Sequence, residues 1–371
     1  MKNVSFKKIK QYARIKNRLY FVNLTLYVSL LLIFFFGPST YFKNLSLLLI
    51  NNFYLGLAFY LLLFSLWFFI LSLPLDYFDS FIIEHRFNLS NQTKLMWLKE
   101  HFKKGLISLI LGFIMIEILY FFLKNFTSSW WIFTAAIWFF ISVILSKLAP
   151  IILLPLFYKQ KPLEDEILKQ RLIQLSKKAR KRIKDVYVID MSKETKKANA
   201  ALVGSGNTRR ILLSDTLLNE YSHDEIEVIL AHELAHHNLK HMLKLLITGG
   251  ILSFIGFYIA SIILKKSVLF FNLEAIYDIR SFPIILFIFL LFSVTITPLQ
   301  NAFSRKLERD ADIYALEITN LYDAFITAMQ KLTKQNLSDP NPSKFIEIML
   351  YDHPPVQKRI SLANRLKIKS K

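Results

Sequence analysis

The segment 232–236 has the sequence His-Glu-Leu-Ala-His, which fits the pattern H-E-x-x-H. Positions i and i+4 of a helix share one face, so His232 and His236 can bind one metal ion. Glu233 lies beside them, placed to take a proton from a metal-bound water. This pattern is typical of zinc peptidases. The alternative interpretation is a solvated helix that carries two unrelated histidines.

Apolar residues occur in long, discrete runs along the chain. Of 371 residues, 54% are hydrophobic and 34 are Phe. Most runs approach the roughly 20 residues that a helix needs to cross a bilayer. Any one run could be a buried core helix, but six together favour a polytopic membrane protein. The predicted spans are 19–36, 53–73, 105–123, 130–145, 245–264 and 282–299.

The formal net charge is +20, and the positive residues are unevenly distributed around the predicted spans. Seven Lys or Arg residues and no acid precede the first span, and five follow the second, whereas the loops after the first and third carry one each. The positive-inside rule then places both termini and the segment 146–244, with its motif, on the cytoplasmic side. Anionic lipid accounts for most of the basic excess, so no nucleic-acid partner is expected.

Four regions are expected along the chain. Residues 1–157 form an N-terminal membrane block of four spans, and 158–244 form a zinc-metallopeptidase core that contains the motif. Residues 245–300 supply two further spans, and 301–371 form a C-terminal helical part. The predicted fold class is therefore mainly α, a polytopic helical membrane protein with a small α+β zinc-metallopeptidase domain.

Local signals predict the elements of the core. Pro162 and the acidic residues that follow it predict the start of an amphipathic helix. The segments 186–189 and 210–213 are expected to be strands. Ser222 can serve as the N-cap of the motif helix with Glu225 at the third helical position, which is a capping box.

Two histidines leave a zinc site incomplete, because peptidase zinc usually has three protein ligands and an open water position. The chain contains no cysteine, which leaves His, Glu or Asp as the third ligand. Glu308 can bind zinc, while Asp312, four residues later, can accept a hydrogen bond from a ligand histidine. The alternative is a charged helix in which Glu308 pairs with a neighbouring arginine. The upstream motif favours the metal site, with one Zn²⁺ per chain.

Three other histidines are open to more than one interpretation. His353 precedes two prolines that stiffen the turn and is a candidate donor to the oxyanion of the reaction, with Arg359 in the next helix. The alternative is a solvated loop histidine. His237 and His241 adjoin the motif but have no glutamate between them in the base position. We interpret them as neighbours of the ligands or as surface residues.

These residues predict a zinc-dependent metalloendopeptidase. Zinc lowers the pKa of its bound water towards about 7, Glu233 takes the proton, and Glu233 then passes it to the leaving amine. An intramembrane protease of the site-2 type is disfavoured, because charged residues flank the motif. A membrane scaffold or transporter with a vestigial metal site is also disfavoured, because a structural site does not need Glu233.

Several stretches together resemble a known family, the type I CaaX prenyl proteases, which are integral-membrane zinc metalloendopeptidases. Their order and spacing make the resemblance more specific than the H-E-x-x-H pattern alone, and they cover most of the chain from about residue 50. The stretches are 81–93, 149–163, 199–218 and 232–236, together with the pattern E-x-x-x-D at 308–312 and H-P-P-x-x-x-R at 353–359.

The resemblance implies a role for each site residue. His232, His236 and Glu308 would bind zinc, Glu233 would be the general base, and Asp312 would support a ligand histidine. Asn199 and Ala200 would lie on an edge strand that pairs with the extended substrate. His353 would stabilise the reaction intermediate, and Arg359 would hold nearby carboxylates. The spans would surround a water-filled chamber.

The chain also departs from the family. Eukaryotic members have seven spans and we predict six, so the first helix and the long loop after it are expected to be missing. This weakens the transfer of substrate preference. The substrate is therefore a peptide or protein at the lipid bilayer, either a C-terminal CaaX-type (prenylated) peptide or a membrane-associated protein cut for quality control.

Overall fold

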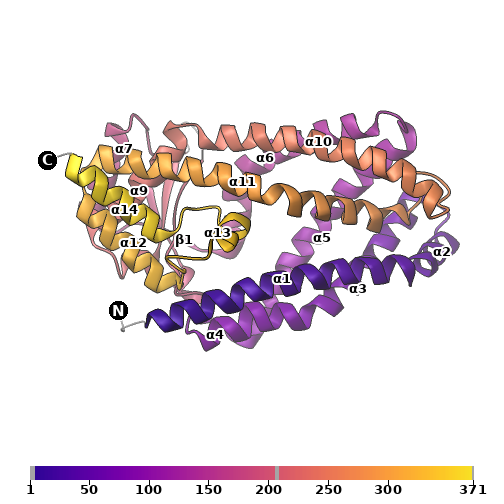
Figure 1. The fold of residues 1–371 in the computed structure, drawn as a ribbon, viewed down its shortest axis with the longest axis horizontal. Coiled ribbons are helices and arrows are strands. Elements are labelled where there is room, and N and C mark those ends of the chain that lie inside the picture. Colours follow the sequence, from indigo (N-terminus) through magenta and orange to yellow (C-terminus); the bar gives the residue numbers. More distant parts are fainter. Residues whose placement is uncertain (1–4, 205–208, 370–371) are drawn as a thin grey trace.

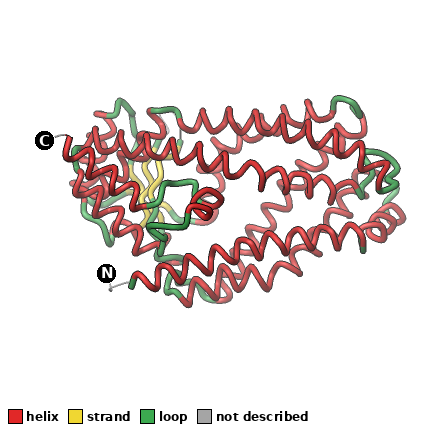
Figure 2. The backbone as a smooth tube through the Cα atoms, viewed as in Figure 1, coloured by secondary structure: helices red, strands yellow, loops and turns green. Residues whose placement is uncertain are grey.

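The computed structural model describes residues 5–204 and 209–369 of an elongated, mainly helical molecule (Figure 1). Long helices run along most of its length. The strands and several shorter helices gather at the end that also holds both ends of the chain (Figure 2). A helical bundle and a small mixed α+β unit thus lie at different positions along one long axis.

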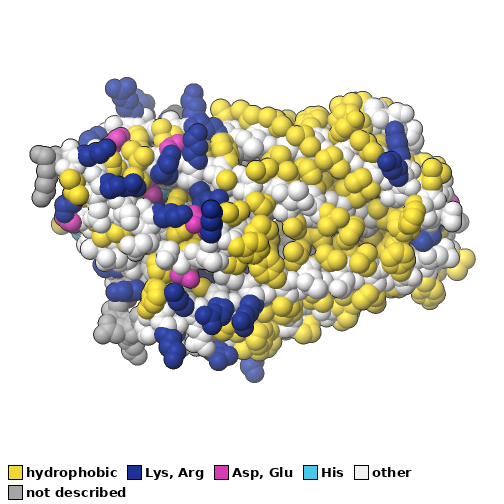
Figure 3. Space-filling view, in the orientation of Figure 1, with side chains coloured by type: hydrophobic (Ala, Val, Ile, Leu, Met, Phe, Trp, Pro, Cys, Tyr) yellow, Lys and Arg dark blue, Asp and Glu magenta, His cyan; other side chains and the backbone are white. Residues whose placement is uncertain are grey.

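Within the described residues, six helices are long and apolar enough to cross a membrane, as predicted. Each of the six predicted spans lies within one of them. Figure 3 shows hydrophobic side chains over the long helical part and Lys and Arg side chains at the end with the sheet. This division suits a bilayer around the bundle and water around the sheet. The helices are α1 (Phe6–Phe36), α3 (Phe53–Tyr77), α5 (Lys94–Asn125), α6 (Trp130–Phe157), α10 (His241–Phe270) and α11 (Ser281–Thr319).

Two helical features were not predicted. A short helix, α2 (Ser39–Leu49), fills the loop between the first two spans. The sixth span and the polar helix after it are one continuous helix, α11, of 39 residues. Its first half packs among the spans, and its second half continues into the unit that contains the sheet (Figure 1). The expected division at residue 300 therefore falls inside a single helix.

The sheet has four strands in the order β1-β2-β4-β3. The strand β2 pairs in parallel with β4, and the two outer strands, β1 and β3, pair antiparallel to their neighbours. The expected strands at 186–189 and 210–213 are present as β2 and β4. The strands are β1 (Gln160–Pro162), β2 (Val186–Ile189), β3 (Ala200–Val203) and β4 (Arg210–Ser214).

The prediction for Pro162 was wrong. Pro162 ends strand β1, where it lies opposite Tyr187, and helix α7 (Glu166–Lys178) begins four residues later. Asp165 is the N-cap, and its side chain accepts a hydrogen bond from the backbone N–H of Leu168. An edge strand tolerates proline, because a backbone N–H that faces away from the sheet is not needed for pairing.

The motif helix is α9 (His223–Asn238), and it begins as predicted. The Ser222 side chain accepts from the backbone N–H of Glu225, and the Glu225 side chain accepts from the backbone N–H of Ser222. This capping box satisfies two N–H groups that would otherwise lack partners. The remaining helices of this end are α8 (Asp215–Leu218), α12 (Tyr322–Asn336), α13 (Lys344–Leu350) and α14 (Val356–Lys369).

Candidate metal centre

The site forms where α9 packs against the second half of α11. Ala231 and Ala235 in α9 are fully buried, as are Ala311 and Ala315 in α11. These small side chains alternate with the polar residues of each helix and allow the two backbones to approach closely. The polar residues between them are therefore brought face to face in a buried position.

His232, His236 and Glu308 converge on one point. Their ligand atoms all lie within 4.8 Å of one another. The Nε2 atoms of the two histidines are 3.2 Å apart, and Glu308 Oε2 lies 3.1 Å from His232 Nε2. Glu308 Oε2 is buried and accepts no hydrogen bond within the described chain. Two imidazole nitrogens and a carboxylate that face one another in this way fit a bound metal cation.

Asp312 lies behind His232 and orients it. Its carboxylate is fully buried, with Oδ1 2.9 Å from His232 Nδ1. Arg359 from α14 donates to both oxygens of Asp312, at 2.8 Å from Nε and 2.5 Å from Nη2. With Nδ1 bonded to Asp312, His232 presents Nε2 to the metal position. This is the arrangement that commonly fixes the tautomer and orientation of a metal-binding histidine.

The electrostatics differ between the two histidines. Burial acts to lower the pKa of His232, but the Asp312 and Glu308 carboxylates outweigh it and raise the pKa to about 9. Burial lowers the pKa of His236 to about 4, and the charge of His232 adds to this shift. His236 is therefore neutral at physiological pH. A metal cation at Nε2 of His232 would take the place of the proton that the surrounding carboxylates favour.

Glu233 and His353 lie beside the three converging residues. Burial raises the pKa of Glu233, and the charges of His232 and Glu308 act on it at close range. His353 Nε2 lies 3.3 Å from Glu308 Oε2, and its Nδ1 lies 2.8 Å from Asp352 Oδ1. The hydrogen bond with Asp352 raises the pKa of His353. Its side chain is 53% exposed, so it can meet a bound substrate.

The two further histidines of the motif segment face other groups. His237 Nε2 lies 3.2 Å from the backbone oxygen of Leu202 in β3. His241 is buried, and its Nδ1 lies 3.1 Å from Nδ1 of His236. Between them Lys240 adopts a φ of 55°, and this left-handed residue turns the chain back between α9 and α10. His237 and His241 therefore contact residues around the site, and neither belongs to the group formed by His232, His236 and Glu308.

Asn199 and Ala200 lie where the open edge of the sheet begins. Ala200 opens β3, which among the described strands pairs with β4 alone. Asn199 precedes the strand, and its backbone N–H donates to Ser214 Oγ at 2.9 Å. Since α9 packs against β3, this open edge lies next to the motif helix.

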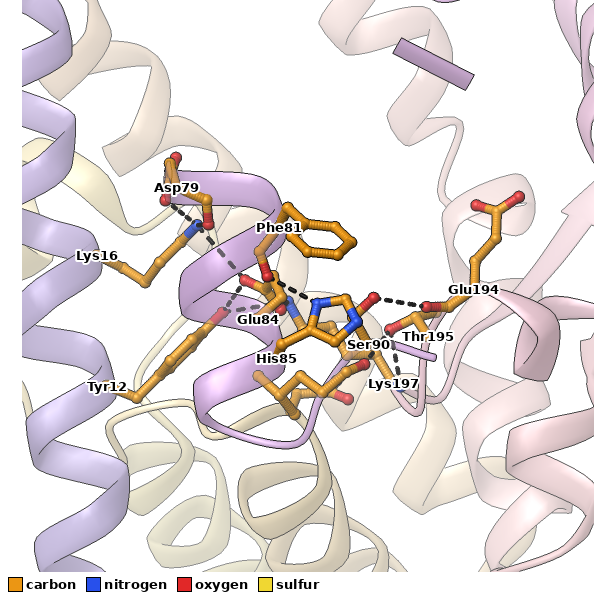
Figure 4. A network of polar contacts seen from close by, with 12 residues as sticks. Tyr12, Lys16, Asp79, Phe81, Glu84, His85, Ser90, Glu194, Thr195 and Lys197 are labelled. Carbon is orange, nitrogen blue, oxygen red and sulfur yellow. Dashed lines mark hydrogen bonds and ion pairs between the residues drawn. The ribbon is translucent and has the colours of Figure 1, made fainter. Parts of the chain in front are cut away.

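The segment that leads into β3 is attached to the membrane block, a contact that we did not predict (Figure 4). The loop after α4 (Glu84–Arg86) forms an isolated antiparallel bridge, in which Ser90 lies opposite Thr195. Lys196 N–H donates to Leu89 O, and Asn91 N–H donates to Glu194 O, both at 2.9 Å. Two segments about 100 residues apart in sequence are thus joined through their backbones.

Charged side chains add to this contact. Lys197 Nζ lies 3.0 Å from Glu84 Oε2, and the Tyr12 hydroxyl of α1 donates to Glu84 Oε1 at 2.7 Å. Lys16, also from α1, pairs with Asp79 of the π-helix η1 (Phe78–Ile83). Figure 4 shows these side chains pointing toward one another from α1, from η1 and α4, and from the segment before β3. No local sequence pattern links residues this far apart, and we had interpreted Lys16 only as part of a cytoplasmic positive charge.

Comparison with known proteins identifies the class and then the family. The N-terminal residues 1–159 match the model described as CAAX prenyl protease N-terminal, five membrane helices. In this region α1, α3, α5 and α6 are long enough to cross a membrane. Residues 162–367 match the model of peptidase family M48. The fold and the site are those of a membrane metallopeptidase. The chain belongs to peptidase family M48.

Individual relatives cover nearly the whole chain. The uncharacterized metalloprotease YhfN of Bacillus subtilis is 28% identical over 96% of this chain and 84% of that protein. CAAX prenyl protease 1 of Saccharomyces cerevisiae is 30% identical over 81% of this chain and 70% of that protein. The crystal structure of S. mikatae Ste24p has a TM-score of 0.86 and 23% identity, and the match covers 97% of this chain and 89% of that one. This structural match shows a shared fold.

These comparisons confirm the predicted fold class and enzyme class. The chain is a multi-pass membrane metalloendopeptidase, which excludes the scaffold or transporter alternative. The site-2 alternative is excluded on a different ground. The motif helix α9 lies outside the six helices that are apolar enough to span, and α10 begins only after it.

The contact between Glu84 and Lys197 predicts a measurable coupling. Lys197→Met leaves the partly buried Glu84 carboxylate without its nearest cation and should cost about 1–2 kcal/mol of stability. Glu84→Gln should cost a similar amount, and the double variant should cost little more than either single one. Thermal unfolding of the purified protein in detergent measures all three.

Lys196→Met is the matched control, because Lys196 is exposed and adjacent in sequence. It should leave the unfolding temperature unchanged. Strictly additive effects of the Glu84 and Lys197 substitutions would show that the pair does not couple the membrane block to the start of β3.

Proposed function

We propose that the metal is zinc, with one Zn²⁺ per chain bound by His232, His236 and Glu308. The observation that carries this proposal is the convergence of their ligand atoms, which all lie within 4.8 Å of one another, with the buried Oε2 of Glu308 3.1 Å from Nε2 of His232. Zinc prefers a tetrahedral set of nitrogen and oxygen ligands and keeps one position open in catalytic sites. When bound, the ion would lower the pKa of a coordinated water and polarise the carbonyl of the substrate.

The residues around the ligands have distinct proposed roles. Glu233 is the general base, which takes the proton of the attacking water and delivers it to the leaving amine. Burial supports this role, because a raised pKa brings the carboxylate nearer to the operating pH. His353 donates to the oxyanion of the intermediate, and its exposed ring beside Glu308 supports this. Asp312 and Arg359 hold His232 in position.

The peptide binds along the open edge of β3. In this proposal the edge strand that begins at Asn199 and Ala200 pairs with an extended substrate, as an added strand would. The backbone of Asn199 bonds to Ser214, so Ala200 is the first residue whose backbone donates to and accepts from the substrate. The strand has β4 on one side only, and its other side is next to the motif helix. Extended binding presents a peptide bond to the metal without folding of the substrate.

We propose two substrate classes at the bilayer. One is C-terminal CaaX-type, prenylated peptides, because relatives over most of the chain are named CAAX prenyl proteases. The other is membrane-associated proteins cut for quality control, with no lipid requirement. The B. subtilis relative, matched over 96% of this chain, is named as a metalloprotease without mention of a prenyl group.

The proposed orientation places both termini and the metal site on the cytoplasmic side. Lys and Arg side chains gather at the end that holds the sheet (Figure 3), as the positive-inside rule expects for that side. We also propose the functional division into a membrane block (1–157), a metallopeptidase core (158–244), two further spans (245–300) and a C-terminal part (301–371) that supplies Glu308 and His353.

Glu233→Gln should retain zinc and lose peptide cleavage by at least about a hundredfold, the lower range for loss of a general base. The amide keeps the size of the side chain but cannot take a proton. Metal content and cleavage rate of the purified variant measure both effects.

Glu308→Ala is the complementary variant and should lose zinc. Substantial activity in Glu233→Gln would contradict the assignment of the base, and full zinc in Glu308→Ala would point to another third ligand.

Cleavage of one CaaX-type peptide with and without its prenyl group distinguishes the two substrate classes. We expect cleavage of both forms, with Glu233→Gln as the blank. Cleavage of the prenylated form alone would assign the chain to CaaX processing. Equal rates for both forms would assign it to general membrane-associated proteolysis.

A reporter fused after Lys371 tests the orientation. A reporter enzyme that works only in the cytoplasm should be active in this fusion, because six spans return the chain to the side on which it began. A reporter that is active only outside the cytoplasm would overturn the proposed orientation of the metal site.

A further inference from the structure

A second polar cavity, of about 510 Å³, lies between the membrane block and the segment that leads into β3. It is lined by residues of α1, η1 and α5 together with Tyr158 and part of 194–197. Five carboxylates and three lysines line it, so its formal charge is two units negative in a chain whose net charge is +20. One of its walls contains the π-helix η1, a distortion that is frequent at functional sites.

Glu194 is the unusual residue of this cavity. It is only 8% exposed, and its Oε1 has no hydrogen-bond partner within the described residues. Its Oε2 accepts a hydrogen bond from the Tyr158 hydroxyl at 3.2 Å. Figure 4 shows the carboxylate pointing away from the contact between Ser90 and Thr195. A buried carboxylate oxygen without a protein partner is uncommon and can be satisfied by a ligand, an ion or a water molecule.

A second carboxylate shares the same surroundings. Glu100 Oε2 is also buried and without a hydrogen-bond partner in the described chain. Burial, followed by the charges of Glu194 and Glu100, raises the pKa of Tyr158 to about 12. The two carboxylates therefore act together on one hydroxyl. Lys16 and Lys197 pair with Asp79 and Glu84, and Lys103 lies 3.8 Å from Glu100 Oε1. Glu194 Oε1 and Glu100 Oε2 have no hydrogen-bond partner among the described residues.

The position of Glu194 connects this cavity to the proposed substrate path. Glu194 precedes Asn199 by five residues, which limits their separation to about 17 Å in an extended chain. A peptide that pairs with β3 and continues past Asn199 would reach the cavity after about five residues. A side chain of the substrate at that distance from the metal site can enter it.

We propose that this cavity, called here the Glu194 pocket, is a substrate subsite that binds a cationic side chain, Lys or Arg, of the peptide. This inference rests on the proposed binding of substrate along β3. The ammonium or guanidinium group donates to Glu194 Oε1 and Glu100 Oε2. A metal ion fits less well, because within the described residues the carboxylates of the pocket do not converge as His232, His236 and Glu308 do. A long, flexible cationic side chain can reach both.

The test uses the full-length enzyme in detergent and a series of fluorogenic peptides. The peptides carry Lys, norleucine or Glu at each of the third to sixth positions on either side of the scissile bond. We expect one position at which Lys improves kcat/KM over norleucine by about tenfold, mainly through a lower KM. Glu194→Gln should reduce that preference to about twofold and leave cleavage of the norleucine peptide within about twofold of wild type.

Glu220→Gln is the matched control, because Glu220 is exposed and lies outside the pocket. It should keep the tenfold preference. Glu194→Lys should reverse the preference, so that the Glu peptide is cleaved faster than the Lys peptide. This reversal distinguishes a charge contact from a loss of folding, which would slow all peptides alike.

Other outcomes would overturn the inference. Equal cleavage of the Lys, norleucine and Glu peptides by the wild-type enzyme would exclude a cationic subsite, while metal-dependent cleavage itself would leave the proposed function intact. An unchanged preference in Glu194→Gln would place the recognition elsewhere. If no peptide were cleaved above the Glu233→Gln blank, the proposed function would fail, and this inference would fail with it.

Discussion

The rest of the site depends on one interaction, the pairing of the buried Asp312 carboxylate with Arg359 and His232. A fully buried carboxylate is costly unless it is paired and hydrogen-bonded, and removing one partner of such a pair costs about 3–5 kcal/mol. Asp312 meets this requirement through two bonds from Arg359 and one contact with His232. The same contacts join α9, α11 and α14 at one point. The pairing that offsets the cost of burying this charge therefore also sets the positions of the side chains that we propose as metal ligands.

The long helix α11 explains how a membrane protein holds this site. Its first half is a span, and its second half carries Glu308 and Asp312 beyond the apolar surface. Glu308, the proposed third ligand, is thus fixed to the bundle without an intervening loop. The edge strand β3 is fixed to the bundle in another way, through the Ser90–Thr195 bridge and the Glu84–Lys197 pair. The converging residues His232, His236 and Glu308 and the edge strand β3, which we propose as the two halves of a substrate site, are each attached to the membrane block.

Much of this arrangement could be predicted from local sequence. The six spans follow from apolar length, and the start of α9 follows from Ser222 and Glu225. His232, His236 and Glu308 were predicted from spacing and ligand chemistry. The pair His232 and His236 and the pair Glu308 and Asp312 each have a spacing of four residues, which places both members on one face of a helix. Asn199, Ala200 and the role of Arg359 came only from resemblance to a family, because neither composition nor spacing distinguishes an edge strand or a remote arginine.

The remainder depends on contacts between distant segments. Pro162 suits both a helix start and an edge strand, and only the pairing with Tyr187 decides between them. The helix α2 lies between the first two spans, where the hydropathy pattern predicts only a connecting loop. The Glu194 pocket and the contacts of Tyr12 and Lys16 join residues separated by up to 185 positions, as for Lys197 and Tyr12. Patterns in a single sequence do not predict contacts between residues so far apart.

In the proposed metal site, α9 and α11 together supply two histidines and one carboxylate. X-ray absorption at the zinc edge of the purified protein measures the number and type of these ligands. We expect about one zinc per chain, two imidazole nitrogens at roughly 2.0–2.1 Å and oxygen for the remaining ligands. Protein without bound metal at full activity, or zinc with a different number of imidazoles, would contradict this proposal.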